Sequence, residues 1–259
     1  MINESTKTWQ ELVKRCYSEY DYISKPRGME VREIINGSYT VPIPAYINLN
    51  ARGVNLGFMF AEAAWIISGS NRLDELTPYM KGYANFSDDG IFMRGAYGPK
   101  VIDQLGYVVD SIEKDNDTRQ AVLNIWRERP GQSKDIPCTL NMQFLLREGK
   151  LHAVVNMRSN DVILGVTYDM FTFSMVAYSV VLLLRARGID VDPGSLLVNA
   201  GSLHLYEKHY ESAKRWVETN TSHSEVPNRV DEVLVGVSTY QELIDSLKKG
   251  ASNATKNKK

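Results

Sequence analysis

Apolar residues near the start of the chain repeat every three or four positions, at Trp9, Leu12, Val13, Cys16, Tyr17 and Tyr20. This spacing predicts an amphipathic helix over the first twenty residues, with Cys16 in the core. A Lys-Pro-Arg-Gly stretch at residues 25–28 ends the pattern. Residues 31–44 are rich in β-branched and turn residues, which predicts strands around Asn36-Gly37.

The middle of the chain alternates between apolar and polar positions with the period of a strand. Apolar side chains occupy every second position in residues 140–146 and again in residues 151–157, and a Glu-Gly pair separates the two runs. This pattern predicts a β-hairpin. Cys138 enters the first strand and Arg158 leaves the second, so antiparallel pairing would make these two residues neighbours.

Four further segments have a recognisable pattern. Residues 56–67 are strongly apolar and predict a buried helix that contains Glu62. Residues 171–187 predict a long central helix with a glycine stop. Residues 196–198 predict a short buried strand, and residues 204–219 predict another helix.

The domain organisation follows from composition along the chain. With 259 residues, of which 43% are hydrophobic, the chain is long enough for one large core. Residues 250–259 are small, polar and basic, which predicts a disordered tail. No linker, repeat or change of composition divides residues 1–249. We therefore predict a single α+β domain over residues 1–249.

Charge and targeting signals restrict the partners and the location. Thirty basic residues nearly balance 31 acidic ones, so no overall field draws the chain to nucleic acid or to an anionic membrane. The polar N-terminus lacks the apolar core of a signal peptide, and no run approaches the roughly 18 apolar residues of a membrane span. We expect a cytoplasmic protein, in a bacterium or in the host of a virus, with no membrane or nucleic-acid partner.

The cysteines and histidines do not predict a metal site. Cys16 and Cys138 are the only cysteines, and neither has a partner at metal-ligand spacing. His204 and His209 are five residues apart, which is one too many for the same face of a helix. The sequence therefore encodes neither a disulfide framework nor a metal site.

The predicted contact between Cys138 and Arg158 suggests a chemistry by itself. A thiol is a strong nucleophile only as the thiolate, and a guanidinium beside it would stabilise that form and bind an anionic group of a substrate. Cys138 is therefore a candidate covalent catalyst. The alternative is a buried structural cysteine, which the residue pattern does not exclude.

Other polar residues also have two interpretations each. Burying Glu62 as an ion among apolar neighbours is costly, which favours a functional carboxyl, although a glutamate on the helix surface is the alternative. Asp161 is either a site residue or the cap of a turn, and Asp169 is either a site residue or the N-cap of the next helix. His204 and Tyr206 are equally explained as core residues.

Four separate motifs together resemble one known family. They are Glu-Ala-Ala-Trp-Ile-Ile-Ser-Gly at 62–69, Pro-Cys at 137–138, Arg-Ser-Asn-Asp-Val-Ile-Leu-Gly at 158–165 and Gly-Ser-Leu-His-Leu-Tyr at 201–206. Their order and approximate spacing resemble the thymidylate synthase superfamily over residues 27–209. The resemblance implies a mixed or antiparallel sheet with packed helices, and a homodimer formed through that sheet.

Within this superfamily the sequence resembles the phage-type deoxycytidylate 5-hydroxymethylases more than thymidylate synthase. Asn160 and Thr139 stand where thymidylate synthases usually have alanine and histidine, and Gly-Ser-Leu-His at 201–204 replaces their Gly-Asp-Thr-His. Asp169 falls where they have the asparagine that reads uracil. An ionised carboxylate only accepts hydrogen bonds, so it fits the N4 amino group of cytosine and a protonated N3. We therefore expect deoxycytidylate, with uracil disfavoured.

The resemblance also implies a mechanism. The Cys138 thiolate adds to C6 of the pyrimidine, and C5 then attacks the one-carbon unit of 5,10-methylenetetrahydrofolate. In a hydroxymethylase, water adds to the exocyclic methylene that remains, whereas in a methylating synthase the folate donates hydride. Glu62 would organise waters and proton transfers, with Tyr97 as a helper.

Binding roles follow from the same motifs. Arg158, Ser159 and Arg27 would hold the phosphate, and Asn160 with Asp169 the base. The sugar hydroxyl would meet His204 and Tyr206, and the folate would meet Asp161, Leu164, Gly165 and Glu62. In this superfamily an arginine of the partner subunit completes the phosphate site, a role that falls to Arg119. Gln120 stands where a second arginine is common, which leaves the clamp one charge short.

Other functions remain open from the sequence. They are a methylating enzyme acting on deoxycytidylate or deoxyuridylate, a cytidylate hydroxymethylase, and a non-catalytic relative that binds nucleotides or RNA. Residues 225–259 do not match the tail with which methylating members close the site. The intact Cys138, Glu62 and Arg158 argue against the non-catalytic relative. We expect an enzyme of nucleotide biosynthesis for DNA modification.

Overall fold

The computed structural model describes residues 2–48, 52–128, 131–218 and 229–256. Their strands form one seven-stranded sheet in the order β1-β2-β7-β5-β4-β3, with β6 beside β7. The strands are β1 Tyr22–Ser24, β2 Val31–Pro42, β3 Val122–Asn124, β4 Thr139–Arg147, β5 Lys150–Met157, β6 Asn160–Asp161 and β7 Asp192–Tyr206.

The sheet is mixed. The pairs β1–β2, β2–β7, β3–β4 and β4–β5 are antiparallel, whereas β5 and β6 both run parallel to β7. Parallel neighbours need a long crossover connection, which a helix after β6 supplies. The helices are α1 Glu4–Ser18, α2 Leu56–Ile67, α3 Gly98–Lys114, α4 Gly165–Ala186, α5 Tyr210–Glu218, α6 Arg229–Leu234 and α7 Tyr240–Lys256. The predicted α+β class with a mixed sheet is confirmed.

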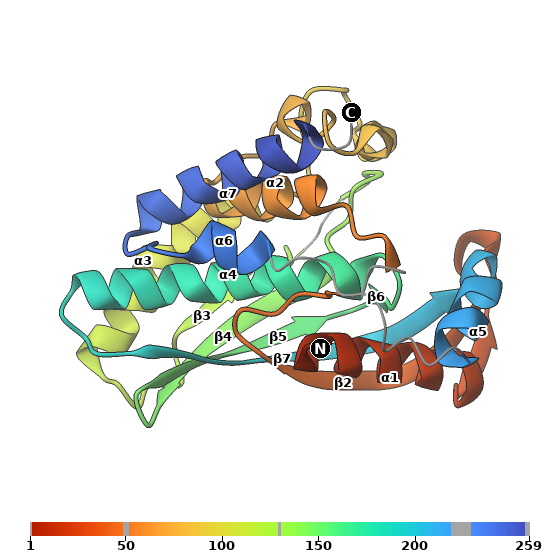
Figure 1. The fold of residues 1–259 in the computed structure, drawn as a ribbon, viewed down its shortest axis with the longest axis horizontal. Coiled ribbons are helices and arrows are strands. Elements are labelled where there is room, and N and C mark those ends of the chain that lie inside the picture. The colour runs from red at the N-terminus through yellow and green to blue at the C-terminus, as the bar shows by residue number, and fades with distance from the viewer. Residues whose placement is uncertain (1, 49–51, 129–130, 219–228, 257–259) are drawn as a thin grey trace.

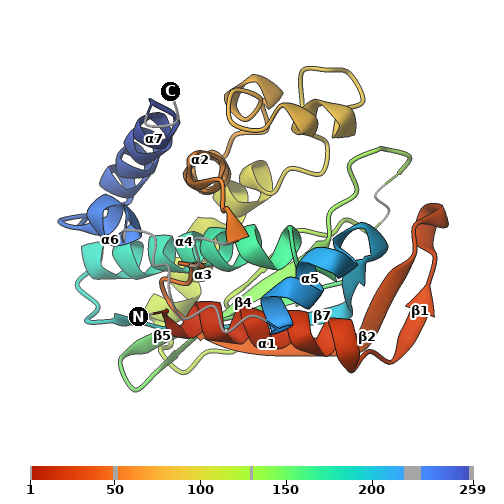
Figure 2. The same cartoon turned by 45° about the vertical axis from the view of Figure 1, so that its right-hand side comes forward.

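Within the described residues, the helices pack on one face of the sheet and leave the other face open. Figure 1 shows α2, α3, α4 and α7 stacked on the same side of the sheet, and Figure 2 shows α1 and α5 beside β2 and β7. Along β5, the odd-numbered side chains from Leu151 to Met157 are buried under α4. The alternate residues His152, Val154 and Asn156 are only half-buried, because successive side chains of a strand point to opposite faces.

The predicted hairpin is confirmed. Thr139 at the start of β4 lies opposite Met157 at the end of β5. The turn residues Glu148 and Gly149 have φ values of 50° and 72°. Positive φ at both central residues is what a two-residue turn of type I′ requires. The turn fixes the register as far as Asn141 opposite Asn156. A β-bulge between Thr139 and Asn141 then shifts the pairing by one residue, which makes Cys138 and Arg158 neighbours.

The first helix is also confirmed, with Cys16 fully buried in it. Three other expectations near the ends of elements are wrong. Residues 31–42 form one continuous strand instead of two strands around Asn36-Gly37, and Asn36 takes a φ of 56° within it. The central helix begins at Gly165, six residues before the predicted start at 171, so Asp169 lies inside it and is not an N-cap.

The C-terminal half differs most from the sequence prediction. Residues 196–198 are part of the 15-residue strand β7, which continues through His204 to Tyr206, where a helix was predicted. The helix itself is only α5, after a 3₁₀ turn at Glu207–His209. Residues 250–256 belong to α7, which buries Ala251 and Ala254, so the predicted disorder is wrong there. Residues 257–259 lie outside the described residues.

Candidate active site

Cys138 and Arg158 lie side by side at the open end of the β4–β5 hairpin. The Arg158 backbone N–H donates to the Cys138 carbonyl at 2.8 Å. Its guanidinium donates from Nε to the Pro137 carbonyl at 2.9 Å and from Nη2 to the Ile136 carbonyl at 3.0 Å. The guanidinium carbon also lies 5.9 Å from the ring centre of Trp126. The predicted neighbourhood of cysteine and arginine is thus confirmed.

The electrostatic setting of Cys138 is more balanced than the sequence suggested. Burial raises the pKa of the thiol, and the charge of Arg158 lowers it. Asp169 raises the same pKa and Arg27 lowers it, but burial prevails. Cys138 is therefore mainly a thiol in the free protein, and additional stabilisation of the thiolate must come with the ligand.

Glu62 projects from α2 and is held by a residue that the sequence analysis missed. The Tyr83 hydroxyl, from the 3₁₀ helix Lys81–Phe86, donates to Glu62 Oε1 at 2.5 Å. Burial raises the pKa of Glu62 to about 7, and the hydrogen bond from Tyr83 opposes this rise. A carboxyl with a pKa near neutrality can both accept and release a proton, which suits a general acid or base.

Asp169 is a second buried carboxyl, early in α4. Burial raises its pKa well above the ordinary value, and the charges of Glu62 and Asp161 raise it further. Both effects favour the protonated form of Asp169, whereas the sequence analysis treated the residue as ionised. Tyr97 lies close by: its hydroxyl accepts from the Thr139 N–H at 3.3 Å, and Asp169 and Cys138 both raise its pKa after burial.

Buried polar atoms without a protein partner surround Asp169. Within the described chain, Asn160 Oδ1 and Tyr39 Oη have no hydrogen-bond partner although both are buried. Asn160 lowers the pKa of Asp169, and the charge of Asp169 raises that of Tyr39 after burial, so the three side chains form one cluster. Orphaned buried polar atoms are costly, which indicates that polar atoms of a ligand bind here.

Gly165 is required by the same cluster. A Cβ atom placed on it would lie 2.2 Å from Asn160 Oδ1 and 3.4 Å from Asp169 Oδ2. Any side chain at this position would therefore displace Asn160 from Asp169. The structure gives Gly165 a steric role beside the folate-binding role that the resemblance implied.

His204, Tyr206 and Asp161 are brought together by strand pairing. Asp161 on β6 lies opposite His204 on β7. The rings of His204 and Tyr206, two residues apart on one face of β7, meet edge to face with centroids 5.0 Å apart. Burial lowers the pKa of His204 more than Asp161 raises it, so the neutral imidazole prevails near pH 7. A neutral imidazole and a phenol offer both donors and acceptors to a sugar hydroxyl.

The predicted folate residues offer an apolar surface next to an acid. Leu164 leaves 44% of its surface exposed, which is unusual for a large apolar side chain at the start of a buried helix. Asp161 Oδ1 accepts from the Ile163 N–H at 2.9 Å, which fixes this carboxylate beside the helix start. An exposed leucine beside a fixed carboxylate fits a flat heterocycle that carries N–H donors.

The phosphate residues are only partly assembled within one chain. Ser159 follows Arg158 in the bend before β6, and Arg27 acts on the pKa of Cys138, which places both near the cysteine. Arg119 is elsewhere: its carbonyl accepts from Gln143 Nε2 on β4 at 2.8 Å, and its side chain is exposed. Gln143 lies four residues along β4 from Thr139, or roughly 13 Å at ~3.3 Å per residue. Arg119 therefore does not join the Cys138 site of its own chain.

Two findings concern metals and membranes. No group of three or more His, Cys, Asp or Glu side chains in the described ranges is placed to hold a metal ion. The helix α4 is long and apolar enough to cross a membrane by length and composition alone, but 83% of its apolar window is buried in the protein. That burial is typical of a core helix. The predicted cytoplasmic location stays a prediction.

Comparison with known proteins agrees with this arrangement. The family model described as thymidylate synthase matches residues 7–229. The chain belongs to the thymidylate synthase family. Family membership agrees with the superfamily resemblance read from the four motifs, and with the mixed sheet that carries Cys138 and Arg158 at one end.

Two proteins that are similar in sequence to this chain come from phages. A deoxyuridylate hydroxymethyltransferase of Bacillus phage SP01 is 31% identical over 229 residues, covering 80% of this chain and 58% of that protein. A deoxyuridylate hydroxymethyltransferase of Pseudomonas phage M6 is 28% identical over 185 residues, covering 68% of this chain and 52% of that protein. The matched part thus spans about half the length of these relatives.

Proposed function

We propose that the protein is a deoxycytidylate 5-hydroxymethylase that uses 5,10-methylenetetrahydrofolate as co-substrate. The observation that carries the base assignment is Asp169, a buried carboxyl with a strongly raised pKa on the same side as Cys138. Family membership supports the reaction class, and the names of the two phage relatives support hydroxymethyl transfer.

The protonation state of Asp169 gives the base preference a physical basis. A protonated Asp169 can transfer its proton to N3 of cytosine, after which the carboxylate accepts from both N3 and N4 in a charge-assisted pair. Uracil already carries a proton on N3, so it cannot take this proton and the pair stays neutral. The positive charge on the cytosine ring also makes C6 more electrophilic toward the Cys138 thiolate.

The remaining site residues bind the phosphate, the sugar and the folate, or transfer protons, in the proposed reaction. Arg158 with Ser159 and Arg27 binds the 5′-phosphate, and His204 with Tyr206 orients the sugar. Glu62, held by Tyr83, accepts the C5 proton and positions the water that adds to the exocyclic methylene. The folate supplies the one-carbon unit, and Leu164 with Asp161 provides a surface and an acceptor for its ring. Retention of Glu62 and Cys138 speaks against a non-catalytic relative.

We also propose a homodimer joined through the open face of the sheet. Val154 is one of the half-buried residues on that face. Figure 1 shows no helix of the described residues packed over it. Arg119 is exposed and remote from the cysteine of its own chain, so it is free to enter the phosphate site of a second copy. This contact would supply part of the charge that the phosphate site lacks.

A second candidate is deoxyuridylate 5-hydroxymethylation. The observation in its favour is that the similar proteins of phages SP01 and M6 are both named deoxyuridylate hydroxymethyltransferases. The chemistry at C5 is the same for both bases. The two candidates differ only in which ring edge pairs with Asp169.

One assay separates these functions. The protein is incubated with 5,10-methylenetetrahydrofolate and deoxycytidylate, cytidylate or deoxyuridylate, and both the base and the folate product are identified. We expect 5-hydroxymethyl-deoxycytidylate together with tetrahydrofolate. Faster turnover of deoxyuridylate would reject the base assignment, and a methylated base with dihydrofolate would reject the hydroxymethylase.

A further inference from the structure

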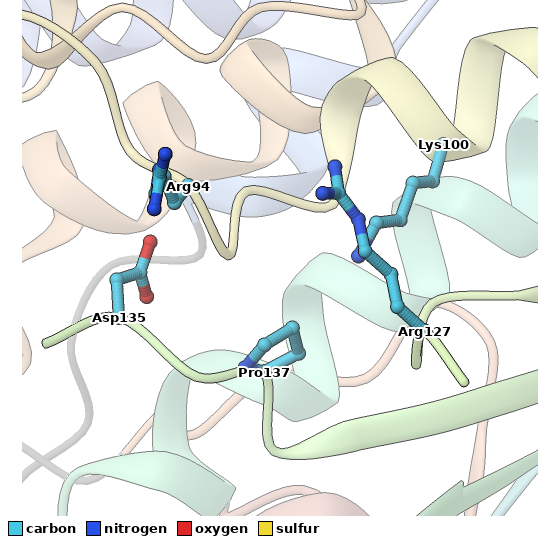
Figure 3. Close-up of a pocket in the computed structure, with 5 residues that line it drawn as sticks. All are labelled: Arg94, Lys100, Arg127, Asp135 and Pro137. Carbon is cyan, nitrogen blue, oxygen red and sulfur yellow. The ribbon is translucent and has the colours of Figure 1, made fainter. Parts of the chain in front are cut away.

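A positively charged cavity lies beside the catalytic cysteine but outside the site described above. It has a volume of about 170 Å³ and is lined by Arg94, Lys100, Arg127, Asp135 and Pro137. Figure 3 shows the side chains of Lys100 and Arg127 next to each other. The carboxylate of Asp135 points toward Arg94, and Pro137 follows Asp135 along the same segment. The cavity therefore combines three cations with one acid, contributed by three separate segments.

The charges of this cavity are poorly compensated. Among the ion pairs found in the described ranges, none joins Arg94, Lys100 or Arg127 to a carboxylate within 4 Å. The Lys100 ammonium donates to the Ile125 carbonyl instead, and both burial and the charge of Arg127 lower its pKa. Asp135 is engaged by the Gly95 N–H at 2.6 Å. Asp88 is a second acid nearby, since Arg94 lowers its pKa. Three cations facing two acids leave one excess positive charge that an anion would neutralise.

An apolar surface continues from the charged part. An adjoining cavity of about 240 Å³ shares all three cations and adds Phe92, Met93, Ala96 and Pro99 to the lining. Phe92 leaves 40% of its surface exposed. An exposed aromatic ring beside arginines can stack on a base while the arginines bind phosphate oxygens in a bidentate manner. The lining therefore fits a ligand with a polyanionic end and a flat, apolar end.

The cavity is separate from the phosphate residues of the proposed active site. Arg158 is tied to the carbonyls of Ile136 and Pro137, whereas the cavity is lined by the Pro137 side chain together with Arg94, Lys100 and Arg127. We propose that Arg94, Lys100 and Arg127 form a second anion site, which binds the phosphate chain of a nucleoside di- or triphosphate with its base against Phe92.

Binding of an anion in this cavity should change the surroundings of Cys138 and Tyr97. Asp135 and Pro137 lead directly into Cys138, and Arg94 and Lys100 flank Tyr97, whose hydroxyl contacts the Thr139 backbone. An occupant that draws these segments together changes the surroundings of the Cys138 thiol. The site thus gives a nucleotide a route to modulate the reactivity of Cys138 without entering the substrate site.

The test is a binding measurement on the full chain, at constant ionic strength because exposed charges are screened by salt. Pyrophosphate and dCTP are titrated by calorimetry into the wild type and into Arg94→Gln, Arg127→Gln and the double variant. Losing hydrogen bonds to a charged group predicts about a tenfold or greater loss of affinity in the double variant. Arg72→Gln, which removes another exposed arginine, should leave the pyrophosphate affinity unchanged. Arg158→Gln is titrated as well, to detect anion binding at the substrate phosphate site.

Three results would overturn the proposal. The first is equal pyrophosphate affinity in the wild type and in the double variant with wild-type Tm. The second is loss of binding in Arg158→Gln alone, which would assign the anion to the substrate site. The third is Arg94-dependent binding of 4-aminobenzoyl-glutamate but not of pyrophosphate, which would assign the cavity to a dicarboxylate. Because no turnover is measured, these outcomes are independent of the proposed enzymatic function.

A second readout tests the link to the cysteine. The rate of Cys138 alkylation by iodoacetamide is followed with and without saturating dCTP. We expect dCTP to change this rate in the wild type and in Arg72→Gln, but not in the double variant. An identical effect of dCTP in the double variant would contradict a site at Arg94 and Arg127.

Discussion

Tyr83 donates a hydrogen bond of 2.5 Å to Glu62, a residue 21 positions earlier in the chain and on a different helix. This bond stabilises the ionised carboxylate against the burial that raises its pKa to about 7. Tyr83→Phe removes the donor, so the pKa of Glu62 should rise further. The pH at which activity reaches half its maximum should then shift upward, and activity near pH 7 should fall several-fold. An unchanged pH profile of kcat would contradict the role of Tyr83.

Ionisation of the buried Glu62 should lower the free energy of unfolding above about pH 7. Its folded pKa of about 7 exceeds the ordinary value of 4.5, so the stability that it contributes is complete below about pH 4.5 and is lost as pH rises through 7. The difference corresponds to roughly 3 kcal/mol as an upper value. We expect Glu62→Gln to be inactive but more resistant to urea than the wild type at pH 8, and no more resistant at pH 4.5. Glu211→Gln, an exposed substitution on α5, serves as the control.

Asp169 should decide the base. Asp169→Asn removes the transferable proton and supplies an amide that matches uracil, so the ratio of kcat/KM for deoxycytidylate over deoxyuridylate should fall by at least tenfold. Steady-state kinetics with both nucleotides measure this ratio. The exposed Asp103→Asn on α3 is the matched control. A base preference that survives Asp169→Asn would refute the recognition argument.

Cys138 should be the covalent nucleophile. Cys138→Ala is expected to abolish turnover and the formation of a nucleotide adduct detectable by mass spectrometry, because the variant lacks the thiol that attacks C6 in the proposed mechanism. Cys16, a fully buried residue of α1, provides the comparison: Cys16→Ala should retain the adduct. Since burial raises the pKa of Cys138, its alkylation in the free protein should accelerate steadily with pH above 7. Turnover in Cys138→Ala would remove the covalent mechanism.

The sequence predicted the hairpin and the nearness of Cys138 to Arg158 because a period of two and a Glu-Gly turn are local signals. It placed His204 in a helix, since His204 to Thr219 has helical spacing, whereas the pairing of β7 with β2 along eleven positions overrides that preference. Such pairing is a long-range effect that no local pattern contains. Tyr83 and Tyr39 were missed for the same reason. Tyr83 is brought to Glu62, and Tyr39 to the neighbourhood of Asp169, only when segments far apart in the sequence pack together.

The raised pKa of Asp169 could not be predicted from the sequence either. Its pKa depends on burial and on the neighbouring carboxyls Glu62 and Asp161, which come from α2 and β6. The residue type and its position in the motif indicated base recognition, but the charge state required the assembled core. The raised pKa changes the recognition argument, because a protonated acid can deliver a proton to N3 of cytosine but also offers a hydrogen-bond donor to O4 of uracil.

The placement of Arg119 leads to a prediction about mixed dimers. Arg119→Ala lacks the residue offered to the partner but keeps its own Cys138, whereas Cys138→Ala lacks the nucleophile but keeps Arg119. Each variant alone should be nearly inactive. If Arg119 serves the partner's site, a dimer of the two variants contains one site with both an intact Cys138 and an intact Arg119. Unfolding and refolding the two variants together should therefore restore up to about a quarter of wild-type activity, since half of the dimers are then mixed and each has one working site.

The same experiment tests the sheet interface. Val154→Asp places a charge on the open face of β5, where burial against a second copy would be costly. Carried by both variants, this substitution should shift the protein to monomers in analytical ultracentrifugation and abolish the restoration of activity. Restoration in the monomeric mixture, or equal activity of Arg119→Ala and wild type, would show that Arg119 does not act across the dimer. The loss of both together would tie the open sheet face to the completion of the phosphate site.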